Sequence, residues 1–268
     1  MTGKGPLAGV TVRSVMRSLN SFVTPRDLIT HARAVMRETG ARVLPVIDGG
    51  RVEGIITQRD VIKVTSTRSN IFIAGMMSPL TLILTPTAEL ATAAREMVER
   101  GLDEAPVVDG YATRNGVGII KIEDILSRLE EAIPQDITVS DVMVEDVVCC
   151  SEDDDLQAVW KLMEESNFSG LPVVRREGGK RKVVGMITRS DLIRKGLVRT
   201  AGESKKGKTA PKVKSIMRTP AITVPTDTKV KAAIRLMREK NIKRLPVIDR
   251  DTLVGIITRS DIIRRFCR

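Results

Sequence analysis

The chain has 268 residues, 42% of them hydrophobic and only 2% aromatic, with 44 basic and 33 acidic side chains. This hydrophobic content excludes a chain that is disordered by composition, and the cores must be built from aliphatic residues and methionine. The sequence shows no run of roughly eighteen apolar residues and no apolar N-terminal stretch of signal-peptide length, so we expect a cytoplasmic protein without a membrane span.

The three cysteines follow neither a disulfide framework nor the spacing of a metal site. Cys149 and Cys150 are adjacent and Cys267 is close to the C-terminus. We therefore expect reduced thiols and no metal. The scarcity of Asn and Gln beside many charged residues is typical of a thermophile.

A pattern of methionine, proline, glycine and aspartate recurs four times along the chain. In every copy a leading Met precedes a Pro by 29 residues, a second Met follows the first by 20 residues, and a Gly precedes an Asp by six residues. The leading residues are Met16, Met77, Met143 and Met217, and the prolines are Pro45, Pro106, Pro172 and Pro246. This regularity indicates a tandem repeat. We expect copies 1 to 4 at 10–66, 71–131, 137–197 and 213–268, with a basic linker at 198–212.

Each copy predicts the element order β-α-β-β-α, an α/β fold. A short apolar strand, such as 221–224, precedes a helix-start signal, for example Thr24 before Pro25 or Ser151 before three acidic residues. The following helix has an apolar face that includes the second Met of the copy, which we interpret as core. A Pro-Val strand, a turn of variable length, a strand of the type GIIT and a second helix near the Asp complete the copy.

One copy of about 50 residues buries too little surface to be robust alone. We therefore expect face-to-face pairs, copy 1 with copy 2 and copy 3 with copy 4. The longest linker, about 196–212, lies inside the second pair, which long loops permit at little extra entropic cost.

The elements VxxVM, LPVID and G-I-I-T-x-x-D, repeated over nearly all of residues 10–268, resemble the cystathionine-β-synthase (CBS) domain in a stand-alone, archaeal or thermophile-like array. The resemblance implies two paired-domain modules in a disc-like arrangement. It also implies that the clefts between paired domains bind adenosine ligands such as AMP, ADP, ATP or S-adenosylmethionine.

The resemblance places a ligand site at the Thr-x-x-Asp motif. The Asp can accept hydrogen bonds from a ribose diol, the Thr hydroxyl can reach a phosphate or sugar oxygen, and a neighbouring Arg can bind phosphate. Taken alone, the motif is a plain helix cap, and the family context favours a ligand. The expected residues are Thr57, Arg59 and Asp60 in copy 1, Thr188, Arg189 and Asp191 in copy 3, and Thr258, Arg259 and Asp261 in copy 4. Copy 2 keeps Asp124 but has Lys121 in place of the Thr.

The segment before each Pro, which approaches the phosphates in the family, differs between copies. Copy 1 has Arg42, copy 3 has Ser169 and Gly170, copy 4 has Lys243 and Arg244, and copy 2 has Asp103 and Glu104. Two acids oppose a phosphate, so we expect a vacant or non-phosphate site in copy 2. The best nucleotide site is expected in copy 4.

A catalytic constellation is missing from the sequence. His31 is the only histidine, and there is no P-loop, Gly-rich dinucleotide motif or HExxH motif. The acidic run at 153–155 is interpreted as the start of a helix rather than a magnesium site. We therefore expect a regulatory protein that is not an enzyme and needs no cofactor.

The basic charge is concentrated in the C-terminal part of the chain. Residues 173–268 carry 27 basic and 8 acidic side chains, whereas residues 1–134 carry 16 and 15. One concentration is a hairpin in copy 3, with Arg175, Arg176, Lys180, Arg181 and Lys182, and the other is the linker, with Lys205, Lys206, Lys208, Lys212 and Lys214. Such residues suit a phosphate backbone.

Two functions remain open. The first is an adenine-nucleotide sensor whose basic half docks on RNA or the ribosome and regulates translation. The alternative is a sensor of a nucleotide or S-adenosylmethionine that regulates a metabolic enzyme or transporter in trans, with the charge serving solubility. A monomer and a homodimer are both compatible with the sequence.

Overall fold

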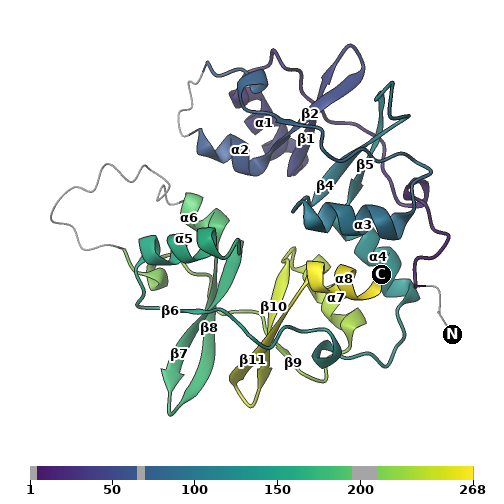
Figure 1. The fold of residues 1–268 in the computed structure, drawn as a ribbon. Helices are drawn as coiled ribbons and strands as arrows, with labels where there is room; N and C mark the ends of the chain where they lie inside the picture. Colours follow the sequence, from purple (N-terminus) through teal and green to yellow (C-terminus); the bar gives the residue numbers. More distant parts are fainter. Residues whose placement is uncertain (1–4, 65–69, 195–210, 268) are drawn as a thin grey trace. The chain divides into compact units, whose positions relative to one another are not determined.

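The computed structural model describes residues 5–64, 70–194 and 211–267 (Figure 1). They divide into two compact units. Unit 1 holds the residues up to Pro134 together with those from Ile262 onward, and unit 2 holds Gln135–Asp261. Copies 1 and 2 therefore share unit 1. Copies 3 and 4 share unit 2, except that the last helix divides at Ile262 between the two units.

Unit 1 follows the predicted element order twice, except that the strand expected before each first helix is only an isolated bridge, Val23 with Val46 and Leu84 with Val107. Copy 1 contains the 3-10 helix η1 (Val12–Ser14), α1 (Ile29–Thr39), β1 (Val43–Asp48), β2 (Arg51–Thr57) and α2 (Gln58–Lys63). Copy 2 contains η2 (Ile73–Gly75), β3 (Ser78–Pro79), α3 (Leu90–Glu99), β4 (Glu104–Val108), β5 (Gly116–Lys121) and α4 (Ile122–Ala132).

Unit 2 repeats this order in copies 3 and 4. Copy 3 contains η3 (Val139–Asp141), β6 (Cys150–Ser151), α5 (Leu156–Glu165), β7 (Gly170–Glu177), β8 (Lys180–Thr188) and α6 (Arg189–Arg194). Copy 4 contains η4 (Val213–Ser215), β9 (Val224–Pro225), α7 (Val230–Glu239), β10 (Arg244–Asp249), β11 (Thr252–Thr258) and α8 (Arg259–Phe266). Within the described ranges every helix is too short or too polar to span a lipid bilayer.

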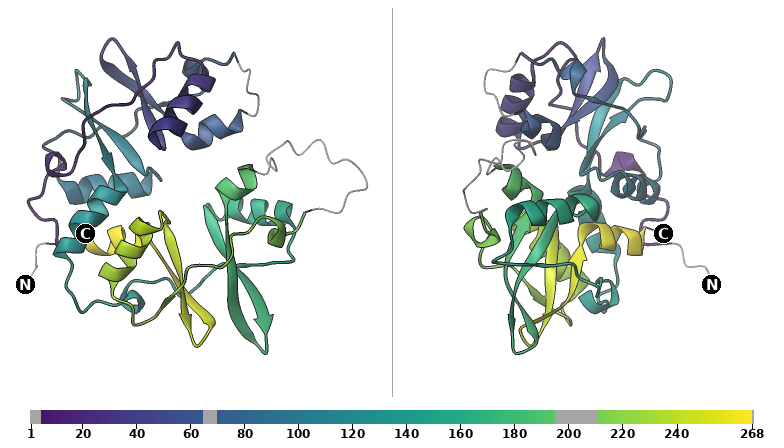
Figure 2. Two further views of the ribbon diagram at one scale, coloured as in Figure 1. Left: turned by 180° about the vertical axis from the view of Figure 1, so that it is seen from behind. Right: turned by 60° about the vertical axis from the view of Figure 1, so that its left-hand side comes forward.

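An antiparallel hairpin forms the centre of each copy, and its register shifts by a bulge after the Pro-Val dipeptide. In unit 2 the two hairpins lie side by side in one sheet of order β6-β7-β8-β11-β10-β9 (Figure 2). The short strands β6 and β9 pair in parallel with the first strand of each hairpin, as the apolar runs before the helices predict.

The second Met of each copy is a core residue, as predicted. Met36 retains 5% of its surface and Met97, Met163 and Met237 retain none. Their neighbours on the same helical faces are buried as well, for example Ala233 on α7. The helices therefore pack through the face that their sequence period predicts.

The predicted helix-start signals form a capped turn, and the helices begin later. Thr24 donates its N–H to Asp27 Oδ2 at 2.6 Å, and α1 begins only at Ile29. Ser151 N donates to Asp154 Oδ2 at 2.8 Å, and the N-cap of α5 is Asp155. The predicted starts are therefore about one turn early, because the same capping chemistry also closes turns.

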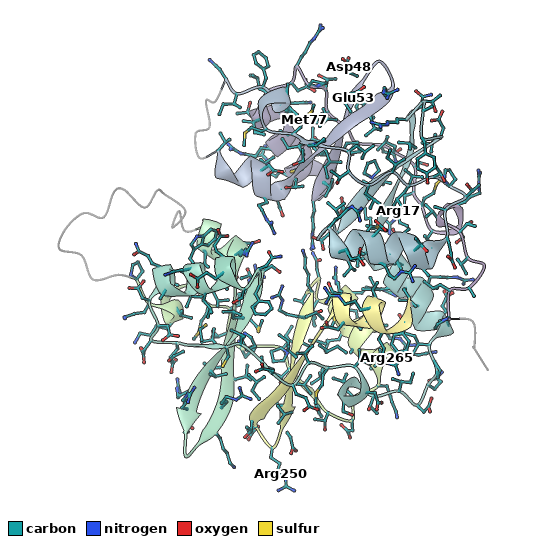
Figure 3. All side chains as sticks on the ribbon, viewed as in Figure 1. Arg17, Asp48, Glu53, Met77, Arg250 and Arg265 are labelled. Carbon is teal, nitrogen blue, oxygen red and sulfur yellow. The ribbon has the colours of Figure 1, made fainter. Side chains whose placement is uncertain are left out.

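The residues after the leading Met of each copy add to the hairpin of its partner copy. The residue directly after that Met, hereafter the exchanged position, pairs antiparallel with the second strand of the partner's hairpin. The four pairs are Arg17 with Ile119, Ser78 with Ile55, Val144 with Ile256, and Arg218 with Met186. Figure 3 shows Arg17 beside the β4–β5 hairpin and Met77 beside the β1–β2 hairpin. Each pair of copies is therefore held together by reciprocal strand exchange.

The exchange explains why a Gly recurs in every copy. A Cβ added to Gly118 would lie 2.8 Å from the carbonyl oxygen of Arg17, and one added to Gly185 would lie 2.9 Å from that of Arg218. The leading Met of the partner copy packs beside the same glycine. The repeated Met and Gly thus meet across the pair, where a side chain would block the approach of the exchanged segment.

Candidate functional site

The Thr-x-x-Asp motif forms a helix cap in copies 1, 3 and 4. In copy 4, Asp261 Oδ2 accepts from Thr258 N at 2.9 Å and from Thr258 Oγ1 at 2.6 Å. The corresponding distances are 3.0 and 2.6 Å in copy 1 and 3.0 and 2.5 Å in copy 3. The Thr hydroxyl proton is therefore committed to the cap, and the predicted contact of the Thr with a ligand would have to use its oxygen as an acceptor.

An arginine from the partner copy reaches Asp191 in copy 3 and Asp124 in copy 2. In copy 3, Arg218 donates from Nε to Asp191 Oδ1 at 3.1 Å, and its Nη2 lies 3.1 Å from the same oxygen. In copy 2, Arg17 donates from Nε to Asp124 Oδ2 at 2.8 Å and from Nη2 to Oδ1. This hydrogen bond and the charge of Asp124 raise the pKa of Arg17. The sequence analysis did not predict either Arg–Asp pair, although the Arg that directly follows the leading Met in copies 1 and 4 could have indicated it.

The arginines that follow the Thr in copies 3 and 4 point to helix carbonyls. Arg259 is 3% exposed and donates from Nη2 to the carbonyl oxygen of Met237 at 3.2 Å. Arg189 donates in the same way to Met163. Both acceptors lie in the last turn of the preceding helix, whose carbonyls lack intrahelical donors. These contacts commit Nη2 of Arg189 and of Arg259 to backbone carbonyls, and phosphate binding by the two arginines stays a prediction, whereas Arg59 of copy 1 is exposed on α2.

The segments before the Pro form a balanced charge network in unit 1. Glu104 is 3% exposed, and its Oε1 lies 3.1 Å from Lys121 Nζ. Its Oε2 accepts from the backbone N of Arg42 at 3.2 Å and of Val43 at 3.4 Å, so it joins the two copies. Arg42 Nη1 also lies 3.9 Å from Asp103 Oδ2. The acids of copy 2 thus neutralise the neighbouring cations.

The equivalent positions in unit 2 carry cations and no acid. Arg244 donates to Ser169 Oγ and to the carbonyl oxygen of Gly170, so its guanidinium spans the two copies. Lys243 precedes it, and the β10–β11 ladder places Arg244 opposite Thr258. The cationic segment of copy 4 therefore lies directly beside the Thr-x-x-Asp motif that contains Asp261.

Part of the predicted polyanion surface is paired with acids. Arg175 makes a two-pronged ion pair with Glu152, at 2.5 Å from Nε and 3.1 Å from Nη2, and Lys214 Nζ lies 2.8 Å from Asp153. These contacts lower the pKa of Glu152 and of Asp153. Arg181 donates to the carbonyl oxygen of Leu253 at 3.1 Å. The exposed cations that remain in the hairpin are Arg176, Lys180 and Lys182, while Lys212 is half-buried.

The remaining predicted residues of this surface, Lys205, Lys206 and Lys208, lie outside the described residues. In the part of the chain that the structure describes, no three His, Cys, Asp or Glu side chains come together as a metal site would require. The acidic run at 152–155 is used instead in ion pairs and caps.

Comparison with known proteins agrees with this architecture. The family model for the CBS domain matches residues 12–66, 73–131, 139–197 and 213–268. The uncharacterized protein MJ1404 of Methanocaldococcus jannaschii is 33% identical over 265 residues, which cover 94% of this chain and 61% of MJ1404. The chain therefore spans less than two thirds of the length of that relative.

Solved structures share the fold over almost the whole chain. Protein MJ1225 of M. jannaschii, proposed as an archaeal homologue of g-AMPK, is 25% identical with a TM-score of 0.76, covering 96% of this chain and 100% of that one. A conserved protein from Pyrococcus horikoshii has a TM-score of 0.67 at 22% identity, over 96% of this chain and 99% of its own.

Proposed function

The chain belongs to the CBS domain family, and on this premise we propose that unit 2 binds an adenine nucleotide, with the ribose at Asp261 and the phosphates at Lys243 and Arg244. The observation that carries the proposal is the contrast between the two units. In unit 2 the segments before the two Pro residues, Ser169-Gly170 and Lys243-Arg244, include two cations and no carboxylate. In unit 1 the corresponding segments include the acids Asp103 and Glu104, which pair with adjacent cations. Phosphate requires cationic donors, and Arg supplies them in a forked geometry.

The position of Arg244 supports the same site. Its guanidinium already bridges Ser169 and Gly170 of copy 3, so a phosphate there would contact both copies of the pair. Ligand binding would then change the contacts across the pair, which is how a sensor without catalytic groups can act on another molecule. The likeness to MJ1225 supports this regulatory, non-enzymatic role.

Isothermal titration calorimetry on the full chain tests the proposal, with AMP, ADP, ATP and S-adenosylmethionine as separate ligands. We expect one nucleotide site, which Asp261→Ala removes. Arg244→Ala should weaken ATP binding about 10- to 100-fold while it leaves adenosine binding nearly unchanged, because one charged hydrogen bond is lost. Asp124→Ala is the matched control and should bind normally. An unchanged stoichiometry in Asp261→Ala would refute the assignment.

A second function, docking on RNA or the ribosome, is favoured by one feature of the β7–β8 hairpin. Its register places Arg175 opposite Lys182 and Arg176 opposite Arg181. Like charges directly opposite one another destabilise a sheet. A polyanion bound along the hairpin would relieve this repulsion, and its affinity would fall steeply with salt.

Sedimentation with ribosomal subunits at two salt concentrations tests this second proposal. The variant with Arg176, Lys180 and Lys182 replaced by Gln should lose co-migration. A charge-matched control that replaces the exposed Arg13, Arg26 and Arg37 of unit 1 should retain it. If the wild-type protein stays at the top of the gradient at both salt concentrations, the basic hairpin serves as surface charge, and a protein partner in trans becomes the leading function.

A further inference from the structure

We propose that Arg218 occupies the ribose-binding carboxylate of copy 3 and thereby limits unit 2 to a single nucleotide, the one at Asp261. This inference rests on the proposed nucleotide function and specifies how many of the repeated motifs can serve it. The inference depends on the residue at the exchanged position, which is not part of the repeated Met, Pro, Gly and Asp pattern.

Hydrogen bonds from Thr188 and Arg218, together with the charge of Arg218, engage both oxygens of Asp191. An ionised carboxylate offers about four lone-pair sites. Oδ2 accepts from the N and Oγ1 of Thr188, at 3.0 and 2.5 Å, and Oδ1 accepts from Nε of Arg218 at 3.1 Å, while Nη2 of Arg218 lies 3.1 Å from the same oxygen. Asp191 is only 5% exposed, while the side chain of Arg218 is 58% exposed. A ribose hydroxyl could reach this carboxylate only by displacing the guanidinium.

Displacement is unfavourable because the competitor is part of the chain. Arg218 is held beside Asp191 by the backbone hydrogen bonds of the exchanged segment, Arg218 N to Met186 O at 2.8 Å and Met186 N to Arg218 O at 3.0 Å. A tethered group competes at a high effective concentration and loses no association entropy. The guanidinium also brings a positive charge to the carboxylate, which a ribose hydroxyl does not.

The exchanged position differs between the copies in a way that divides the four motifs into two classes. Arg17 faces Asp124 and Arg218 faces Asp191. The corresponding residues that face copies 1 and 4 are Ser78 and Val144, which carry no guanidinium. Each unit therefore has one motif filled by an arginine of the partner copy and one motif whose partner cannot supply that group.

The closed motif of unit 1 provides a control from the same chain. Copy 2 has Lys121 in place of the Thr, and the buried Glu104 takes the position that a phosphate-binding residue would need. Removing Arg17 should therefore uncover Asp124 without creating a nucleotide site. In copy 3, by contrast, Thr188 and the cations of copy 4 remain when Arg218 is removed.

The experiment is calorimetric titration of the full chain with AMP. Wild-type protein should bind at one site, and Arg218→Val, which installs the residue of the equivalent position in copy 3, should bind at two. Asp191→Asn added to Arg218→Val should return the stoichiometry to one. Arg17→Ser should leave it unchanged. Thermal unfolding of each variant checks that the fold is retained, and Arg218→Ser provides a second substitution with the residue found in copy 2.

The outcomes separate this inference from the function on which it rests. One site in both Arg218 variants, with the affinity of the wild-type protein, would overturn the inference and leave the nucleotide function standing. One site with an affinity weakened 10-fold or more would also overturn it, because Arg218 would then contact the ligand directly. Absence of binding in the wild-type protein and in all variants would refute the nucleotide function itself.

Discussion

Gly118→Ala should destabilise unit 1 because a Cβ at this position meets the exchanged segment. The added carbon would lie 2.8 Å from the carbonyl oxygen of Arg17. An ordinary carbon–oxygen contact is about 3.4 Å, so the carbonyl would have to retreat by about 0.6 Å. The same carbonyl accepts from Ile119 N at 2.9 Å, and Arg17 N donates to Ile119 O at 2.8 Å. The substitution therefore strains both hydrogen bonds of the exchange.

The expected net loss is about 1–3 kcal/mol in the free energy of unfolding. Overpacking typically costs about 1–3 kcal/mol, and a weakened backbone hydrogen bond adds about 1 kcal/mol. Against this, Ala in an ordinary strand position is favoured over Gly by about 0.5–1 kcal/mol. Urea denaturation of the full chain, followed by circular dichroism, measures the difference from the wild-type protein.

Gly75→Ala is the control in the same unit, because an added Cβ there meets nothing within 4 Å. It should leave the stability unchanged or raise it slightly. If Gly118→Ala and Gly75→Ala unfold at the same urea concentration, steric need does not explain the repeated glycine.

Three further predictions concern buried groups and a hairpin tip. Glu104→Ala should cost about 3 kcal/mol of unfolding free energy, since it leaves a partly buried cation without its partner, and urea denaturation measures this. Burial raises the pKa of Cys150 to about 12, so in native protein at pH 8 a thiol reagent should modify the half-buried Cys149 and spare Cys150. The free energy of unfolding should also fall as the pH rises from 9 to 12, because the Cys150 thiol ionises at a lower pH in the unfolded chain than in the folded one. Arg250 and Asp251 have φ of 46° and 67° at the tip of the β10–β11 hairpin (Figure 3). Asn-Gly is favoured at such a two-residue turn, so Arg250→Asn with Asp251→Gly should add about 0.5–1 kcal/mol to the free energy of unfolding and raise the thermal midpoint.

Local patterns in the sequence were sufficient to predict the element order and the core. Met97 and Met163 lie in the core because the helical period places them on the apolar face. The same local signals misplaced the helix starts at Thr24 and Ser151, because a polar side chain that caps a turn is indistinguishable in sequence from one that caps a helix.

The site depended on contacts that no local period encodes. Arg17 and Asp124 are 107 residues apart in the chain, and the strand exchange alone brings them together. The direction of Arg259 was equally inaccessible, because its motif is compatible with both a ligand and the carbonyl of Met237. The charge contrast before the Pro could be predicted, since it depends on which residues are present and not on where their side chains point.

The reciprocal exchange has a consequence for how such a chain can grow or shrink. A single added copy would carry a segment after its leading Met with no strand to receive it, and it would leave one sheet edge uncovered and prone to pair with another molecule. When two copies are added or removed together, every exchanged segment still pairs with the hairpin of a partner copy. The repeat number of such arrays should therefore be even, and duplications that are inherited should span a whole pair.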